Sequence, residues 1–183
     1  MTLKEEIQQD LKSAVLAKKQ LETSVLRLIN AAILNKEKEK RYKIASSYTI
    51  LKEAKAPYSK ISQGKPDISE EDLVKESQLQ DGEVIEVIST EVKKRKESIE
   101  LFEKGQRLDL VDKEKKELEI LQNYLPEQLP EEELKKLVKE AVEKVGAREI
   151  KDMGKVMAEL MPKVKGRAGG TLVSKIVKEL LGL

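Results

Sequence analysis

Apolar residues recur every three or four positions along most of the chain, a spacing that predicts amphipathic α-helices. Near the N-terminus, Thr2 and Glu5 form a capping-box pattern, which predicts a first helix that ends at about Ala17. A second helix is expected from about Leu21, and it continues into the charged stretch "NKEKEKRYK". We interpret this stretch as a solvated helix end, with a binding patch as the alternative. The expected buried face of this second helix consists of Val25, Leu28, Ile29, Ala32 and Ile33.

The middle of the chain alternates between polar connectors and helical patterns. The segment "KAPYSKISQGKPDIS" contains Pro57, Gly64 and Pro66, so we expect an irregular connector there. Helices are expected after a Ser69 cap, from about residue 81 to 104, and again after Asp109, which we predict to be a cap.

The stretch "YLPEQLP" separates these helices from the C-terminal part of the chain. Two prolines four residues apart cannot lie inside one regular helix, so residues 126–130 are predicted to form a hinge. Three helices are expected after it, over residues 131–145, about 152–161 and 171–181. Pro162 is predicted to end the second of them, and the Thr171 hydroxyl to cap the third.

These patterns predict an all-α protein in two parts. Residues 1–125 are expected to form an extended N-terminal helical hairpin or bundle, with a variable insertion at 35–80. Residues 131–183 are expected to form a small C-terminal three-helix domain.

The composition narrows the chemistry that is available to the protein. Of 183 residues, 38% are charged and 3% aromatic, and there is no cysteine or histidine. Disulfides, zinc sites with nitrogen or sulfur ligands and Ser–His or Cys–His nucleophile pairs are therefore excluded. We predict no catalytic residues, no metal and no cofactor. The sequence lacks a stretch of ~18 apolar residues and an apolar signal core, so a cytoplasmic protein without a membrane partner is expected.

Positive charge is concentrated at the C-terminal end. The formal net charge is +2, but residues 151–183 contain seven basic and three acidic residues. Within them, "PKVKGRAGG" at 162–170 combines three cations with three glycines. One interpretation is a phosphate site, in which accessible glycine amides precede a helix N-terminus and the cations point one way in an extended loop. The other is a plain connector whose glycines supply left-handed backbone angles.

Two further patterns have structural interpretations. The four cations at 93–96 are interpreted as solvated helix surface, with a contact to a nucleic-acid backbone as the alternative. The glutamates at 91, 97 and 100 are placed to pair with Arg95, Lys93 and Lys96.

Methionines at 153, 157 and 161 are interpreted as core residues, with an adaptable partner surface as the alternative.

Three segments together resemble the GatB/YqeY family. They are "SVLRLINAAI" from residue 24, "EVKKRKESIELFEKGQRLDLVDKEKKELEILQNYLPEQL" from 91 and "DMGKVMAELMPKVKGRAGGTLVSKIV" from 152. The resemblance implies an all-helical protein related to the C-terminal part of the B subunit of the tRNA-dependent Asp/Glu amidotransferase, where the corresponding tail contacts tRNA. It also implies the family label of a carbon–nitrogen ligase with glutamine as amido-N-donor, although this chain contains no catalytic constellation.

We therefore expect a stand-alone protein that binds tRNA or another structured RNA as an accessory or adaptor in translation. One alternative is a subunit in glutamine-dependent tRNA amidation, with amidotransferase or tRNA synthetase proteins as partners. A second alternative is a protein–protein interaction module. The predicted RNA-binding residues are Lys155, Lys163, Lys165, Gly166, Arg167, Gly169, Gly170, Thr171 and Lys175.

Overall fold

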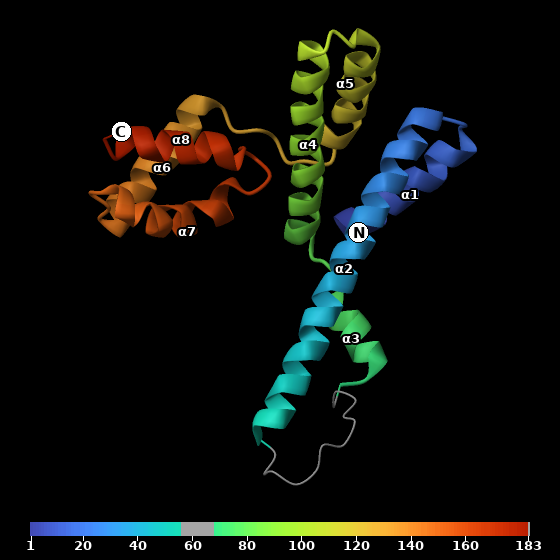
Figure 1. Cartoon of the computed structure of the whole chain (residues 1–183), viewed down its shortest axis with the longest axis horizontal. Coiled ribbons are helices and arrows are strands. Elements are labelled where there is room, and N and C mark those ends of the chain that lie inside the picture. The colour runs from blue at the N-terminus through green and yellow to red at the C-terminus, as the bar shows by residue number, and fades with distance from the viewer. Residues whose placement is uncertain (56–67, 183) are drawn as a thin grey trace. The chain divides into compact units, whose positions relative to one another are not determined.

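The computed structural model describes residues 1–55 and 68–182, with the side chains of 48–55 left out (Figure 1). This part of the chain contains eight α-helices, one short 3-10 helix and no strand, which confirms the all-α fold class. The connector with Pro57, Gly64 and Pro66 lies outside the described residues. The chain divides into two compact units, residues 1–87 and residues 88–183.

In the first unit, α1 (Leu3–Leu16) packs against the N-terminal part of α2 (Gln20–Lys55) (Figure 1). The predicted capping box is present: the Glu5 amide donates to the Thr2 hydroxyl at 3.2 Å, and the Thr2 amide donates to the Glu5 carboxylate at 2.8 Å. The core between these helices contains Ile7, Ala14, Val25, Leu26, Ile29 and Ile33.

The buried face of α2 matches the predicted one in part, since Val25, Ile29 and Ile33 are buried as predicted. Leu26 is fully buried, whereas Leu28, which the sequence pattern places in the core, is 40% exposed. Leu26 therefore belongs to the buried face of α2, and Leu28 lies on its exposed side.

The charged stretch of α2 was predicted correctly only in part: most of its residues are exposed, as expected, but it is not a helix end. The helix continues to Lys55, and Glu37 within the stretch is only 4% exposed. The Lys4 ammonium donates to the Glu37 carboxylate, and Lys40 donates to Glu83 at 2.8 Å. These charges are buried or half-buried because they join α2 to the segments that pack on it.

The short helix α3 (Glu70–Ser77) also packs on α2. Its predicted cap is confirmed, since the Asp72 amide donates to the Ser69 hydroxyl at 3.0 Å. The Arg41 Nε donates to the Ser77 hydroxyl at 3.2 Å, which ties α2 to the C-terminal end of α3.

The division between the two units falls within α4 (Asp81–Lys104), which forms an antiparallel hairpin with α5 (Leu108–Gln122) (Figure 1). The predicted cap at Asp109 was wrong. Arg107 is the N-cap of α5 and makes no capping side-chain bond, whereas Asp109 accepts two hydrogen bonds from the Arg107 guanidinium.

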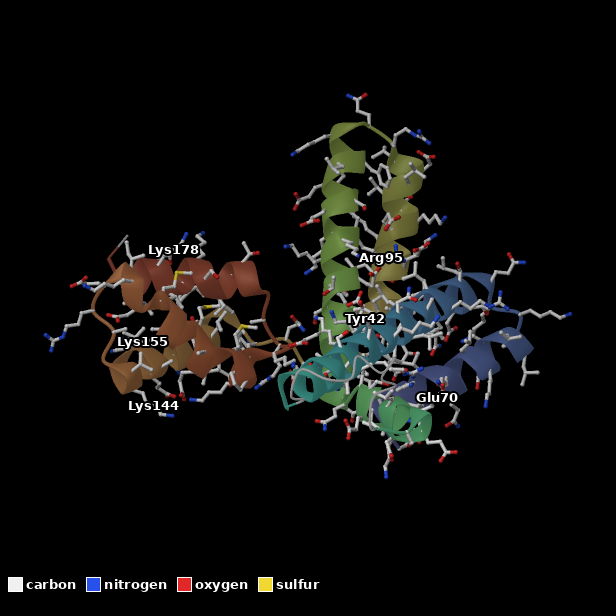
Figure 2. All side chains as sticks on the ribbon, turned by 60° about the horizontal axis from the view of Figure 1, so that its bottom comes forward. Tyr42, Glu70, Arg95, Lys144, Lys155 and Lys178 are labelled. Atoms are coloured by element: carbon white, nitrogen blue, oxygen red, sulfur yellow. The ribbon has the colours of Figure 1, made fainter. Side chains whose placement is uncertain are left out.

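Within this hairpin, Arg95 is buried and not part of a solvated surface (Figure 2). Its Nη1 contacts Glu114 at 2.9 Å and Glu117 at 2.8 Å, both on α5. The predicted partner Glu91 instead pairs with Lys94 at 2.7 Å, while the predicted pair of Lys93 with Glu97 is present at 3.8 Å. The interpretation of residues 93–96 as surface therefore fails at Arg95.

The last three helices share one apolar core. They are α6 (Glu131–Val145), α7 (Met153–Val164) and α8 (Gly170–Leu180), with the 3-10 turn Ile150–Asp152 ahead of α7. The core residues are Leu129, Leu134, Val138, Ala141, Val156, Leu160, Val164, Val173, Ile176 and Val177. Met153 and Met157 pack against this core, as predicted, but Met161 is 40% exposed.

Two predicted helix boundaries in this core were wrong. Pro162 lies inside the last turn of α7, and the helix continues to Val164 because that side chain is buried in the core. Thr171 does not cap α8: the helix begins at Gly170, Gly169 is the N-cap, and no side chain bonds the free amides.

Candidate nucleic-acid interface

The connection between α7 and α8 is a folded turn and not an extended loop. The amides of Arg167 and Ala168 both donate to the Val164 carbonyl, at 2.9 and 3.0 Å. Gly166 has a φ of 73°, a left-handed angle that glycine adopts without strain. Lys163 belongs to the last turn of α7, so the predicted extended array of three alternating cations is wrong.

Residues of the predicted hinge bind this turn directly. The Leu129 amide donates to the Arg167 carbonyl at 2.8 Å, and Gln128 Nε2 donates to the Gly166 carbonyl at 2.8 Å. In the other direction, Arg167 Nε donates to the Glu127 carbonyl at 3.3 Å. Sequence reasoning missed these contacts, because it used "YLPEQLP" only as a helix break and did not connect it with residues about forty positions away.

The N-terminus of α8 offers unpaired backbone donors. The first amides of a helix have no acceptor within it, and here no side chain supplies one. A Cβ atom built on Gly169 or Gly170 would meet nothing within 4 Å, so the backbone at this position is open to a ligand. The first turn of α8 contains no acidic residue, and the helix dipole favours an anion there.

The sequence around this helix start is purely basic. Residues 160–178 contain five basic residues and no acidic residue. Lys163 lies 3.2 Å from the half-buried Glu159, and Lys175 lies 3.9 Å from the exposed Glu179. Lys178 on α8 is exposed and has no ion-pair partner among the described residues (Figure 2). The prediction had not included it.

Glu159 on α7 is held between two lysines. Lys144 lies 2.7 Å and Lys163 3.2 Å from the same carboxylate oxygen. Hydrogen bonds from these ammonium groups lower the pKa of Glu159 below its ordinary value. The negative charge of this carboxylate partly offsets the positive charge of Lys163.

Lys155 lies apart from the turn between α7 and α8. It is eight residues before Lys163 on α7, a separation of about 12 Å along the helix axis. Its ammonium lies 2.9 Å from Asp152. This hydrogen bond, together with one from the Arg148 amide, lowers the pKa of Asp152. The predicted residues thus fall into one group around residues 163–175 and a separate lysine at the other end of α7.

The described part of the chain shows no group of three or more acidic side chains arranged to hold a metal ion. Nor does any helix there have the length and apolar character that spanning a membrane requires.

The fold and this basic surface define a small all-helical protein. Its last three helices, α6 to α8, form a C-terminal unit in which the N-terminus of α8 is open to solvent and surrounded by positive charge. A family model described as "Yqey-like protein" matches residues 51–181. The chain therefore belongs to the YqeY-like family, as the sequence resemblance implied. The matched range begins within α2, so it includes residues 51–80 and excludes the segment from residue 24 that also carried the resemblance.

Two curated relatives are fungal proteins. The chain is 39% identical over 106 residues to "Altered inheritance of mitochondria protein 41, mitochondrial" of Pyrenophora tritici-repentis, a match that covers 56% of this chain and 58% of the relative. It is 45% identical over 47 residues to an uncharacterized protein of Schizosaccharomyces pombe, covering 26% of this chain and 38% of that protein. The matches thus span less than two thirds of either relative.

Proposed function

We propose that the C-terminal unit binds phosphate groups of a structured RNA such as tRNA, and that the protein acts as an accessory or adaptor without a catalytic centre of its own. The observation that carries this proposal is the uncapped N-terminus of α8, which lies in a stretch of five cations without an acid. The proposed contacts are the Gly170 and Thr171 amides for one phosphate and the lysines of α7 and α8 for neighbouring phosphates.

The ion pairs at this surface do not oppose RNA binding strongly. Lys163 and Lys175 are paired with exposed or half-exposed glutamates, and such surface pairs are typically worth about 0–1 kcal/mol. Exchanging a glutamate for a phosphate therefore costs little. Phosphate contacts fix the position of a protein on RNA without reading its sequence, so we expect recognition of RNA shape.

Fluorescence anisotropy with unfractionated tRNA tests the proposal. The test variant replaces Lys163, Lys175 and Lys178 by glutamine, and leaves Arg167 intact because its guanidinium anchors the turn. The matched control replaces three other exposed lysines of the same part of the chain, namely Lys136 and Lys139 on α6 and Lys151 in the 3-10 turn.

We expect the test variant to bind tRNA more weakly, and the slope of its log affinity against log salt concentration to be smaller by about two units. The control variant should keep most of the affinity and most of the salt dependence of the unmodified protein. A DNA duplex of similar length should bind more weakly than tRNA at moderate salt. Equal losses in the two variants, or no preference for tRNA, would contradict the proposed interface.

A protein–protein module is the second candidate function, and exposed apolar side chains in the same unit favour it. Met161, Leu172 and Leu180 are each 38–46% exposed on α7 and α8. Replacing all three by serine should abolish capture of a protein partner and leave tRNA binding unchanged if this surface serves such a partner.

The name of the fungal relative associates that protein with mitochondria. We propose a compartment that contains tRNA for this chain too, either the cytoplasm or the mitochondrion. Fractionation of cells that express the tagged protein distinguishes the two.

A further inference from the structure

An open groove lies at the turn between α1 and α2, far along the sequence from the proposed RNA contact. Its volume is ≈ 480 Å³, and it is a shallow groove that is open to solvent along one side. The residues that line it are Val15, Lys18, Gln20, Thr23, Ser24 and Arg27.

The lining is positively charged and contains no carboxylate. Among the described residues, neither Lys18 nor Arg27 has an ion-pair partner. The nearby Glu22 does not neutralise them, because it pairs with Lys19 at 2.9 Å, and neither residue lines the groove. Two cations without an ion-pair partner in the described part of the chain therefore line the groove, Lys18 from the α1–α2 turn and Arg27 from α2.

The neutral side chains of the groove add hydrogen-bonding groups. Ser24 and Arg27 are three residues apart on α2 and so lie on one face of the helix, next to the Thr23 hydroxyl. A guanidinium with hydroxyl donors matches the oxygens of a phosphate, whose hydrogen bonds to charged donors are short and strong. Val15 supplies an apolar contact that an inorganic ion would not use.

The backbone at Lys18 is unusual for a lysine. Its φ is 55°, and the turn has the hydrogen bonds of a Schellman motif: the Lys18 amide donates to the Val15 carbonyl at 3.2 Å and the Lys19 amide to the Ala14 carbonyl at 3.0 Å. Glycine is the usual residue at this position, and Gly146 has the corresponding conformation after α6. This turn fixes the backbone of Lys18, one of the residues that line the groove.

We propose that this groove binds the phosphate group of a nucleotide, with Arg27 and Lys18 as the charged ligands and Ser24 and Thr23 as neutral donors. The phosphate belongs either to a free mononucleotide or to a polynucleotide backbone. Because every lining residue precedes residue 28, the proposal is independent of the RNA contact proposed for the C-terminal unit. "SVLRLINAAI", the segment that contains Ser24 and Arg27, has no role in that contact.

NMR titration of the full-length ¹⁵N-labelled protein tests this proposal. The probes are AMP, which has a phosphate monoester; the dinucleotide ApA, which has one internal phosphodiester; and adenosine, which has neither. We expect AMP or ApA to shift the amide resonances of Lys18, Thr23, Ser24 and Arg27 to saturation, and adenosine to leave them unchanged. Saturation by AMP alone identifies a free nucleotide as the ligand, and saturation by ApA identifies a polynucleotide backbone.

Three variants separate the groove from general electrostatic attraction. Arg27→Gln and Lys18→Gln should each weaken binding by about tenfold, the effect of losing one charge-assisted hydrogen bond. Lys12→Gln removes another exposed cation, from α1, that does not line the groove, and should change binding less than twofold. The Lys163, Lys175 and Lys178 variant should bind the nucleotide normally, which distinguishes this site from the RNA contact. Failure of both phosphate probes, or equal losses for Arg27→Gln and Lys12→Gln, overturns the proposal.

Discussion

Replacing Arg95 by methionine should destabilise the protein by about 3 kcal/mol at neutral pH. Arg95 is 9% exposed, and its guanidinium contacts Glu114 and Glu117 at 2.9 and 2.8 Å. Methionine keeps most of the apolar contact of the arginine side chain but leaves two carboxylates on neighbouring turns of α5 without their shared cation. Removing one partner of a buried ion pair typically costs about 3–5 kcal/mol.

The lower end of that range applies for two structural reasons. Glu114 keeps 19% of its side-chain exposure, and Lys113 lies 3.9 Å from Glu117, so the remaining charges are partly hydrated and partly compensated. In addition, Arg95 Nε is buried without a hydrogen-bond partner, and the substitution removes this unsatisfied donor. Both effects reduce the loss.

Urea unfolding followed by far-UV circular dichroism measures the change in free energy. Lys93→Met is the control, because Lys93 lies on the same helix, has a 68% exposed side chain and makes a 3.8 Å surface pair that is worth less than ~1 kcal/mol. The double variant Arg95→Met/Glu117→Met should recover part of the loss, since it removes the more buried carboxylate. A loss for Arg95→Met within 0.5 kcal/mol of the control, an interval of about the scatter expected for additive changes, would refute the argument from burial.

Three further predictions follow from backbone angles and ion pairs. Lys18→Gly and Gln106→Gly should each raise the free energy of unfolding by about 1 kcal/mol, because each residue has a φ of 55° that glycine adopts without strain; urea unfolding measures both. Gly146→Ala should lower it by a similar amount through strain alone, since its φ is 64° and the new Cβ atom meets nothing within 4 Å. Stability should also fall on acidification. The carboxyls of Asp152 and Glu159 have lowered pKa values, so they bind protons more weakly in the folded than in the unfolded protein. Their contribution is present above their ordinary pKa values of about 4 and is lost as the pH falls through those values to the lower folded ones. Between pH 5 and pH 3 the melting temperature of Asp152→Asn/Glu159→Gln should fall less than that of the unmodified protein.

Helix positions followed well from the sequence because they depend on local signals. The capping patterns at Thr2 and Ser69 were correct, since each involves contacts within four residues. The errors at Asp109 and Thr171 concern the position of the helix start: α5 begins at Leu108 and α8 at Gly170, so each predicted capping residue is the second residue of its helix.

The burial of charged residues could not be predicted, because it depends on partners far along the chain. Glu37 lies in a run of charged residues that predicts exposure to solvent. Its carboxylate is nevertheless buried and accepts a hydrogen bond from Lys4 of α1. Arg95 likewise lies in a basic run, and only its position opposite α5 makes it a core residue. Local charge patterns contain no information about such pairings.

The turn between α7 and α8 depends both on local sequence signals and on contacts with residues far along the chain, and the second kind affects how tightly the turn can bind a phosphate. Sequence composition identified its cations and glycines, but its conformation is set by Gln128 and Leu129, which lie about forty residues away. These bonds engage the Gly166 and Arg167 carbonyls, whereas the open amides of α8 have no side-chain partner. A turn that is already anchored loses little conformational entropy when it binds a phosphate, so more of the interaction energy remains for affinity. The segment that the sequence presents as a hinge is therefore, in our proposal, the support that holds the phosphate site in place.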